Sequence, residues 1–100
     1  MTNKSPKTIV ENINTPGKTS QVDAKKYNDM RDAMMQTLPS QSPGFSHAEI
    51  KEAVKPLLDQ TLFPGGKTSG WWSKTVQLDL EAKGVIKRSE TKPLRWYKPS

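Results

Sequence analysis

The tetrapeptide Gly-Lys-Thr-Ser occurs twice in this chain, at residues 17–20 and 66–69, and GK[ST] is how a phosphate-binding loop ends. The full loop, GxxxxGK[ST], needs another glycine five residues before the second one, so that successive backbone N–H groups can curl around phosphate. Those two positions hold Asn12 and Thr61. Neither copy meets the requirement, so both are predicted to be glycine-containing turns and not nucleotide-binding loops.

Residues suited to catalysis or metal binding are scarce. The chain has no cysteine and a single histidine, His47, and it shows no cluster of metal ligands and no nucleophile motif. The acids Glu49, Glu52 and Asp59 fall on the polar face of a predicted helix, where solvation is their ordinary role. We therefore expect a protein that is not an enzyme and that uses neither a cofactor nor a metal.

Positive charge is concentrated at one end of the chain. The formal net charge is +6, and residues 64–100 carry eight Lys and Arg against three Asp and Glu. All three tryptophans and Tyr97 lie in the same stretch. A basic, aromatic-rich end on a neutral body is typical of a surface that attracts polyanions, nucleic acids above all.

The expected compartment follows from what the sequence lacks. A chain of 100 residues with 32% hydrophobic content predicts one small domain. No apolar run approaches the ~18 residues of a membrane span, and the N-terminus has no apolar signal-peptide core. The absence of cysteine fits a reducing compartment. We expect a cytoplasmic protein that does not bind membranes.

The elements that position the basic end can be read along the chain. Two short strands, 8–13 and 19–22, flank Thr15-Pro16-Gly17-Lys18, which fits a type II turn because Pro fixes φ and Gly accepts a positive φ. This hairpin is expected to pack on the body only in part. Asp23 then suits the N-cap of a helix over 24–37.

Two further helices follow. Ser46 and Glu49 form a capping box for the second, whose apolar face continues to Leu62 and whose Pro56 predicts a break near Lys55. The third is expected to start at Ser69 or Gly70 and to end at Gly84. Its buried sides are predicted to hold Trp72, Val76 and Leu80, and Trp71, Leu78 and Ala82. Its outward face is predicted to hold Ser73, Lys74, Gln77 and Glu81.

The last part of the chain has the composition of strands. Residues 85–90 and 94–98 are rich in strand formers and flank Thr91-Lys92-Pro93, which predicts a two-stranded hairpin with basic residues on both strands. The order is then helix, helix, helix, hairpin. The predicted fold class is α+β, mainly α, with a further short hairpin at the N-terminus.

This order carries a family resemblance. LDLEAKGVIKRSETKPLRWYK, residues 78–98, resembles the end of the recognition helix and the wing of winged helix-turn-helix proteins. The stretches VENINTPGKTSQVDAKKY, LFPGG and GWWSKTVQLDLEAKGVIKR are similar to a family of small bacterial proteins of unknown function. The resemblance implies a winged-helix domain over 23–98, preceded by an extension or hairpin over 1–22. It implies no established activity.

The leading hypothesis is a non-enzymatic winged-helix protein that binds nucleic acid, with double-stranded DNA as the expected form and transcriptional regulation as a candidate role. Ser73, Lys74 and Gln77 would approach the bases, while Lys67, Thr68 and the helix N-terminus would hold a phosphate. The wing would add basic contacts from Lys87, Arg88, Lys92, Arg95 and Lys98. Because the outward face of the third helix has no arginine to read guanine, phosphate contacts are expected to dominate.

The alternative hypothesis is a protein–protein interaction module built on the same fold, because a fold does not determine function. It rests on the aromatic residues Trp71, Trp72, Trp96 and Tyr97, since aromatics are favoured at interface centres. An accessible tryptophan would favour this hypothesis, and fully protected tryptophans would indicate a core. The sequence leaves open whether the protein acts as a monomer or as a homodimer.

Overall fold

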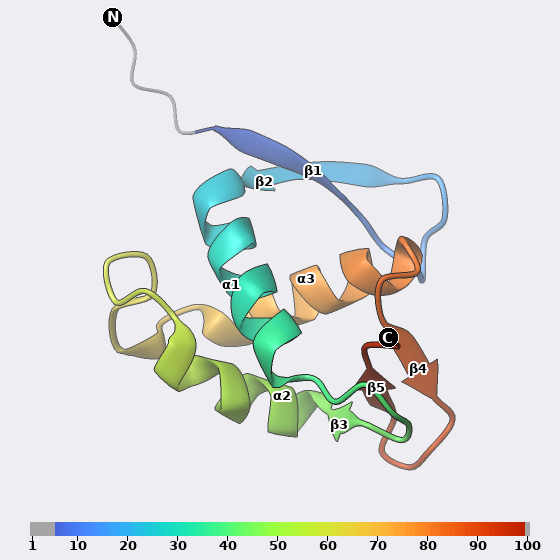
Figure 1. The fold of residues 1–100 in the computed structure, drawn as a ribbon. Helices are drawn as coiled ribbons and strands as arrows, with labels where there is room; N and C mark the ends of the chain where they lie inside the picture. Colours follow the sequence, from blue (N-terminus) through green and yellow to red (C-terminus); the bar gives the residue numbers. More distant parts are fainter. Residues whose placement is uncertain (1–5, 100) are drawn as a thin grey trace, which may run out of the picture.

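The computed structural model describes residues 6–99, so the first five residues of the predicted N-terminal extension lie outside it. Three helices dominate an α+β arrangement with two small antiparallel sheets (Figure 1). The elements run in the order β1 (Lys7–Glu11), β2 (Thr19–Asp23), α1 (Ala24–Thr37), β3 (Phe45–Ser46), α2 (His47–Val54), two 3-10 turns (Lys55–Leu57 and Pro64–Gly66), α3 (Ser69–Ala82), β4 (Lys87–Ser89) and β5 (Arg95–Tyr97).

Local signals account for the helix ends. The Asp23 carboxylate accepts from the backbone N–H groups of Lys25 and Lys26 at 2.8 and 3.2 Å, which confirms the predicted cap and bounds of α1. The capping box of α2 is complete in both directions. That helix ends at Val54, where the chain tightens into a 3-10 turn at Pro56, so the predicted break is confirmed.

The N-terminal hairpin forms with the predicted turn. The N–H of Lys18 donates to the carbonyl of Thr15 at 3.1 Å, and Gly17 has φ +88°, as a type II turn requires. The inward side chains Val10 and Val22 are only 5% and 9% exposed. The hairpin therefore contributes to the core from its inner face.

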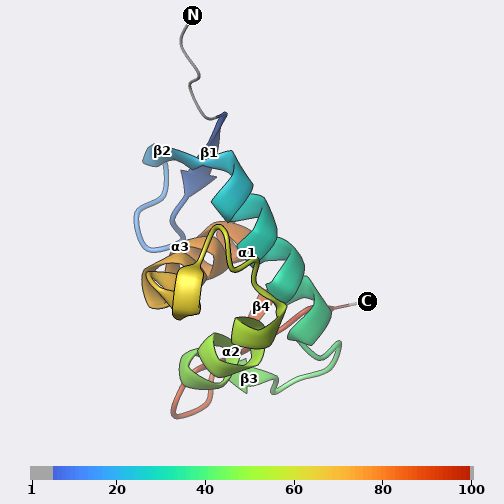
Figure 2. The same ribbon diagram turned by 90° about the vertical axis from the view of Figure 1, so that its left-hand side faces the viewer.

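Helix α3 occupies the centre of the molecule, with the N-terminal hairpin on one side and α2 on the other (Figures 1 and 2). The hydrophobic core of the molecule is formed by residues from all three helices, both sheets and the connecting loops. The buried apolar side chains are Val10, Val22, Tyr27, Met30, Ala33, Met34, Leu38, Ile50, Val54, Leu58, Phe63, Trp72, Val76, Leu80, Ile86 and Trp96. Within residues 6–99, none of the helices has the length and apolar character needed to cross a bilayer.

The second sheet contains one strand more than predicted. Its order is β3-β5-β4, so β5 is the central strand. Trp96 of β5 lies opposite Phe45 of β3 and opposite Arg88 of β4. A two-residue strand such as β3 has no periodicity that a sequence could reveal. The pairing depends on Gly44, where φ is +90° and an added Cβ would lie 1.8 Å from the carbonyl oxygen of Trp96.

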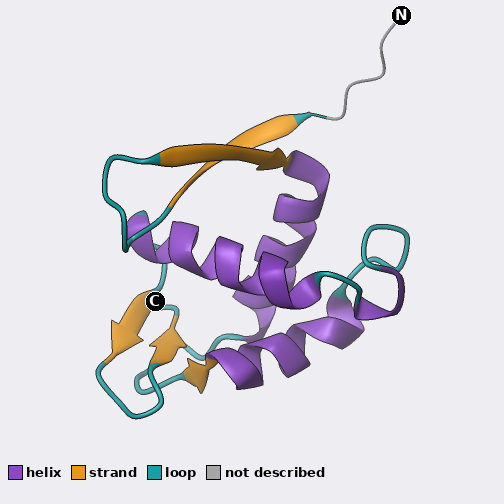
Figure 3. Ribbon diagram, turned by 180° about the vertical axis from the view of Figure 1, so that it is seen from behind, coloured by secondary structure: helices purple, strands orange, loops and turns teal. Residues whose placement is uncertain are grey.

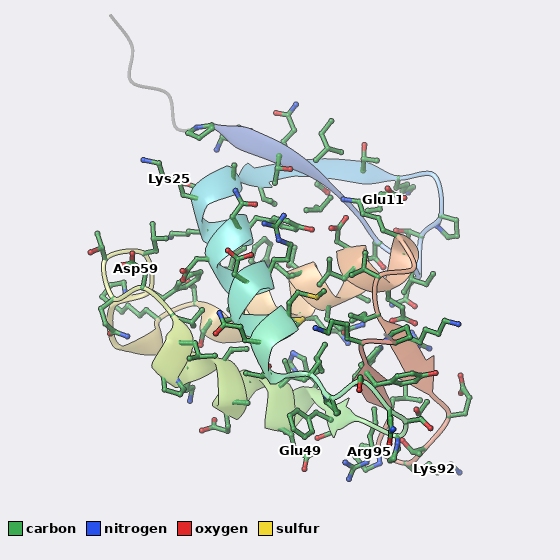
Figure 4. The ribbon with its side chains drawn as sticks, in the orientation of Figure 1. Glu11, Lys25, Glu49, Asp59, Lys92 and Arg95 are labelled. Carbon is green, nitrogen blue, oxygen red and sulfur yellow. The ribbon has the colours of Figure 1, made fainter. Side chains whose placement is uncertain are left out.

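A buried carboxylate joins the hairpin to the helices. Asp79 of α3 is fully buried and accepts from the backbone N–H of Glu11 at 2.8 Å, from the hydroxyl of Tyr27, and from Lys83 at 2.9 Å. Figure 4 shows Glu11 on β1, above the C-terminal half of α3. Burial, and then the hydrogen bond to Asp79, raise the pKa of Tyr27, which keeps this hydroxyl a donor.

Replacing Asp79 by alanine should lower the free energy of unfolding by about 3 kcal/mol, because donors from β1, from α1 and from the residue after α3 would lose their shared acceptor. Urea unfolding followed by circular dichroism measures this. Asp32→Ala is the matched control, since Asp32 is 63% exposed in its ion pair with Arg31. We expect that variant to change stability by less than about 1 kcal/mol. Equal losses in the two variants would contradict a central role for Asp79.

Candidate nucleic-acid interface

The predicted basic residues fall into two groups. Lys67, Lys74, Lys87 and Lys92 are exposed and Lys98 is partly exposed, and none of them forms an ion pair with another residue of 6–99. Arg88 and Arg95 instead pair with Glu81 and Glu49. The lysines are therefore the side chains available to an external anion, while both wing arginines are engaged within the domain.

The prediction that Ser73 and Gln77 face outward is wrong, because both side chains are 0% exposed. The Ser73 hydroxyl donates to the carbonyl of Gly70 at 3.0 Å, and the Gln77 amide donates to Glu81 at 2.8 Å. These polar residues lie on the inner side of α3, and Ser73 faces α2. In this conformation they cannot approach the bases of a nucleic acid.

The outward face of α3 is less polar than predicted. Trp71 is 58% exposed, contrary to the prediction that it is buried, and Thr75 and Leu78 are partly exposed beside it. At about 100° per residue these three positions share one face of the helix. The sequence predicted that both tryptophans are buried. Only Trp72 lies in the core.

A cationic junction forms where α2, α3 and β5 meet, and it consists of His47, Lys51 and Lys74. Lys51 lies over Gly70, so close that an added Cβ there would be 3.4 Å from its Cε. The Nζ of Lys74 lies 5.8 Å from the centre of the Trp96 ring. Partial burial, followed by the charges of Lys74 and Lys51, lowers the pKa of His47. Such surroundings favour an added negative charge.

His47 has a neighbour that the sequence did not reveal. Its Nε2 lies 3.2 Å from the hydroxyl oxygen of Ser73. A serine nucleophile would donate its proton to that histidine, but Ser73 donates to Gly70 and is fully buried. The contact thus serves as a link between α2 and α3.

Among residues 6–99, no group of three or more His, Cys, Asp or Glu side chains is arranged to hold a metal ion.

Glu81 connects α3 to the wing formed by β4 and β5. One carboxylate oxygen accepts from the Trp96 indole at 2.9 Å and from Gln77 at 2.8 Å, while the other lies 2.9 Å from Nε of Arg88. Arg88 therefore holds the wing against α3. Its charge is largely neutralised, which reduces the contribution predicted for it at a phosphate.

Arg95 has a comparable role at the start of α2. Its guanidinium donates to Glu49 at 2.8 Å and to the carbonyl of Gly44 at 3.1 Å. The backbone hydrogen bond from Ser46 and the charge of Arg95 lower the pKa of Glu49. Figure 4 shows Glu49 and Arg95 side by side at the lower edge of the domain, with Lys92 at the neighbouring wing tip.

The second Gly-Lys-Thr-Ser is the turn into α3, as predicted. Thr68 takes the N-cap position with φ +62°, and its hydroxyl donates to the carbonyl of Lys67 at 2.6 Å. The side chain does not cap the helix, so the first N–H groups of α3 remain without a side-chain cap. Lys67 and Thr68 are both exposed beside them.

Comparison with known proteins identifies one family. Residues 7–96 match a family described as a family of unknown function, DUF6958, and the chain belongs to that family. This confirms the predicted resemblance to an uncharacterised family. A search of curated proteins and a search of solved structures each found no match.

The lowered pKa of His47 predicts a pH-dependent stability. Because the unfolded state binds the proton more tightly, the stability due to neutral His47 is complete above the ordinary pKa of 6.5. It should be lost as the pH falls from there through the lower folded-state pKa. Urea midpoints at pH about 7.5 and about 5.5 measure the loss. His47→Gln should show a smaller difference, and an undiminished difference in that variant would contradict the assignment.

Proposed function

We propose that this protein binds nucleic acid, with double-stranded DNA as the form that fits best, mainly through its phosphates. The observation that carries the proposal is the cationic junction of His47, Lys51 and Lys74, which contains a histidine flanked by two lysines. The phosphate oxygens of a nucleic acid could accept hydrogen bonds from all three of these side chains. The lysines of the wing extend the same chemistry.

The arrangement of elements supports this choice. The order α1-β3-α2-α3-β4-β5, with a sheet of order β3-β5-β4, is the one expected of a winged helix-turn-helix domain. We therefore propose that fold for residues 23–98, with the hairpin β1-β2 as an addition packed on α3. In such domains the third helix approaches the DNA groove and the wing contacts the backbone.

The mode of binding differs from the one predicted for this helix. Lys74 is the one residue of the predicted base-reading set that is exposed, since Ser73 and Gln77 are buried. Lysine contacts a phosphate as a point charge and carries little sequence information. We therefore propose binding with weak sequence preference, in which Lys67, Lys74, Lys87, Lys92 and Lys98 provide phosphate contacts. His47 and Lys51 would add to the contact at Lys74.

A protein-interaction module remains the second candidate, and Trp71 is the observation that favours it. This side chain is 58% exposed and packs edge-on against Trp72, with ring centres 5.0 Å apart. Aromatic side chains held in place on a surface are common at interface centres. If iodide quenches the tryptophan fluorescence and added DNA does not, Trp71 is accessible but does not contact DNA. That result would favour a protein partner at this position.

The DNA proposal is tested by the salt dependence of binding. Fluorescence anisotropy of a labelled random-sequence duplex should give a log affinity that falls linearly with log salt. The double variant Lys74→Ala with Lys92→Ala should bind more weakly to every sequence. Its salt dependence should be shallower, by about one unit of slope for each phosphate that a lysine no longer neutralises.

The matched control is Lys7→Ala with Lys25→Ala, which removes the same charge from exposed positions near the N-terminal hairpin. Figure 4 shows Lys25 and Lys92 at opposite ends of the molecule. The control should lose less affinity than the double variant at equal salt. An equal loss would mean that only net charge matters, and no binding at the lowest salt would refute the proposal.

Binding should also strengthen as the pH falls. A phosphate near His47 raises its pKa in the complex above the lowered value of the free protein, so protonation and binding favour each other. We expect tighter binding at pH about 5.5 than at about 7.5. His47→Gln should remove most of this gain, and a gain that survives the substitution would place the phosphate elsewhere.

A further inference from the structure

The hydrogen-bond pattern of the N-terminal hairpin shows which of its backbone groups point outward. The N–H of Ala24 donates to the carbonyl of Pro6 at 2.9 Å, which identifies this pair as a hydrogen-bonded one. Because such pairs alternate along an antiparallel ladder, the pairs Ile9–Gln21 and Glu11–Thr19 are not hydrogen-bonded. The N–H and C=O groups of these four residues therefore point away from the hairpin.

The two outward edges differ in how they are used. On β1, the N–H of Glu11 donates to the buried Asp79 carboxylate of α3. On β2, no group within residues 6–99 accepts from the N–H of Thr19 or Gln21. Thr19, Ser20 and Gln21 are all exposed. An edge strand is usually protected by charged residues, by Pro or by a bulge; β2 has neither Pro nor a bulge, and its one charged residue, Asp23, lies at its end and caps α1.

A cavity of about 360 Å³ lies between the N-terminal hairpin and the outward face of α3, and residues of β1, the turn and β2 all line it. Seen from behind, β2 runs along the upper edge of the domain with α3 below it (Figure 3). Val10 of β1 and Ser20 and Val22 of β2 line its hairpin side, and Trp71, Thr75 and Leu78 line the other. A strand added at the open edge of β2 would extend the sheet next to this cavity.

We propose that this added strand is β2 of a second copy of the chain, paired antiparallel about a two-fold axis at Gln21. In that register Gln21 faces Gln21, Thr19 faces Asp23 and Ser20 faces Val22. At the axis, the outward N–H and C=O of Gln21 in each copy meet those of the other, as a hydrogen-bonded pair requires. Asp23 is the N-cap of α1, so its carbonyl accepts a helix hydrogen bond and only its N–H is available to Thr19. The result is a four-stranded sheet in the order β1-β2-β2-β1, with Trp71 of each copy beneath it.

Charge favours a second copy over a polyanion at this position. The cavity is lined by one cation and one anion, Lys18 and Glu11, so it has no net charge. The symmetric register also places no like charges directly opposite each other, which would destabilise the pairing. This assembly is independent of nucleic-acid binding, and it is measured on the protein alone.

Sedimentation equilibrium from low micromolar to submillimolar concentration should show a monomer–dimer equilibrium. Gln21→Pro removes one outward N–H without breaking a bond inside the hairpin, because the Ile9–Gln21 pair is not hydrogen-bonded. It should raise the dimer Kd about tenfold or more. Ile9→Pro is the matched control, since it makes the same change at the opposite edge, and its dimer Kd should stay near that of the natural chain.

A cross-linking experiment tests the register itself, and it does not depend on proline being tolerated. Hydrogen-bonded antiparallel partners have Cα atoms about 5.5 Å apart, within the range of a disulfide. The chain has no cysteine. Gln21→Cys should therefore form a disulfide-linked dimer on mild oxidation, much faster than Ile9→Cys.

Three outcomes would overturn the proposal. The first is a monomer at the highest concentration, and the second is a dimer that Gln21→Pro weakens no more than Ile9→Pro. The third is equal rates of cross-linking for Gln21→Cys and Ile9→Cys. Loss of DNA binding in the same variants would not bear on it, because each of these measurements is made without nucleic acid.

Discussion

The fold of this protein depends on a carboxylate that is fully removed from water. An isolated buried carboxylate would cost several kcal/mol, so Asp79 is tolerable only where donors surround it. Those donors are Glu11 of β1, Tyr27 of α1 and Lys83, the C-cap residue that follows α3. The three elements must therefore be in place together. Glu81, two positions further along α3, does the same for Trp96 and Arg88 of the wing.

Much of the fold could be predicted because its helix ends and turns are encoded locally. Asp23, Ser46 with Glu49, and Pro56 each act within a few residues, and each sets a boundary that the structure has. Strand β3 could not be found, since its existence depends on Gly44 meeting the backbone of Trp96. The hairpin packs on the body only in part, as predicted, with one buried residue in each strand. Its hydrogen bond from Glu11 to Asp79 could not be predicted, because Asp79 is distant in sequence.

The candidate site was predictable in its charges and not in its geometry. The excess of lysine at the C-terminal end is visible in composition, and those side chains are exposed. The buried face of α3 could not be identified from polarity, because polar residues ordinarily lie outside. The Ser73 hydroxyl contacts His47 of α2, and the Gln77 amide nitrogen donates to Glu81, while within residues 6–99 the buried Gln77 oxygen has no hydrogen-bond partner. The junction of His47 with Lys51 and Lys74 appears only when α2 and α3 are brought together.

Helix α3 separates the residues that fold the domain from those that meet its surroundings. Its inner side is fixed by Asp79, Glu81 and the buried Gln77, whereas Trp71 makes most of its surface available to solvent. Amino-acid substitutions on the outer side of α3 should therefore change the free energy of unfolding only a little. Within this architecture, the outer face can acquire new partners by single substitutions while the scaffold stays intact.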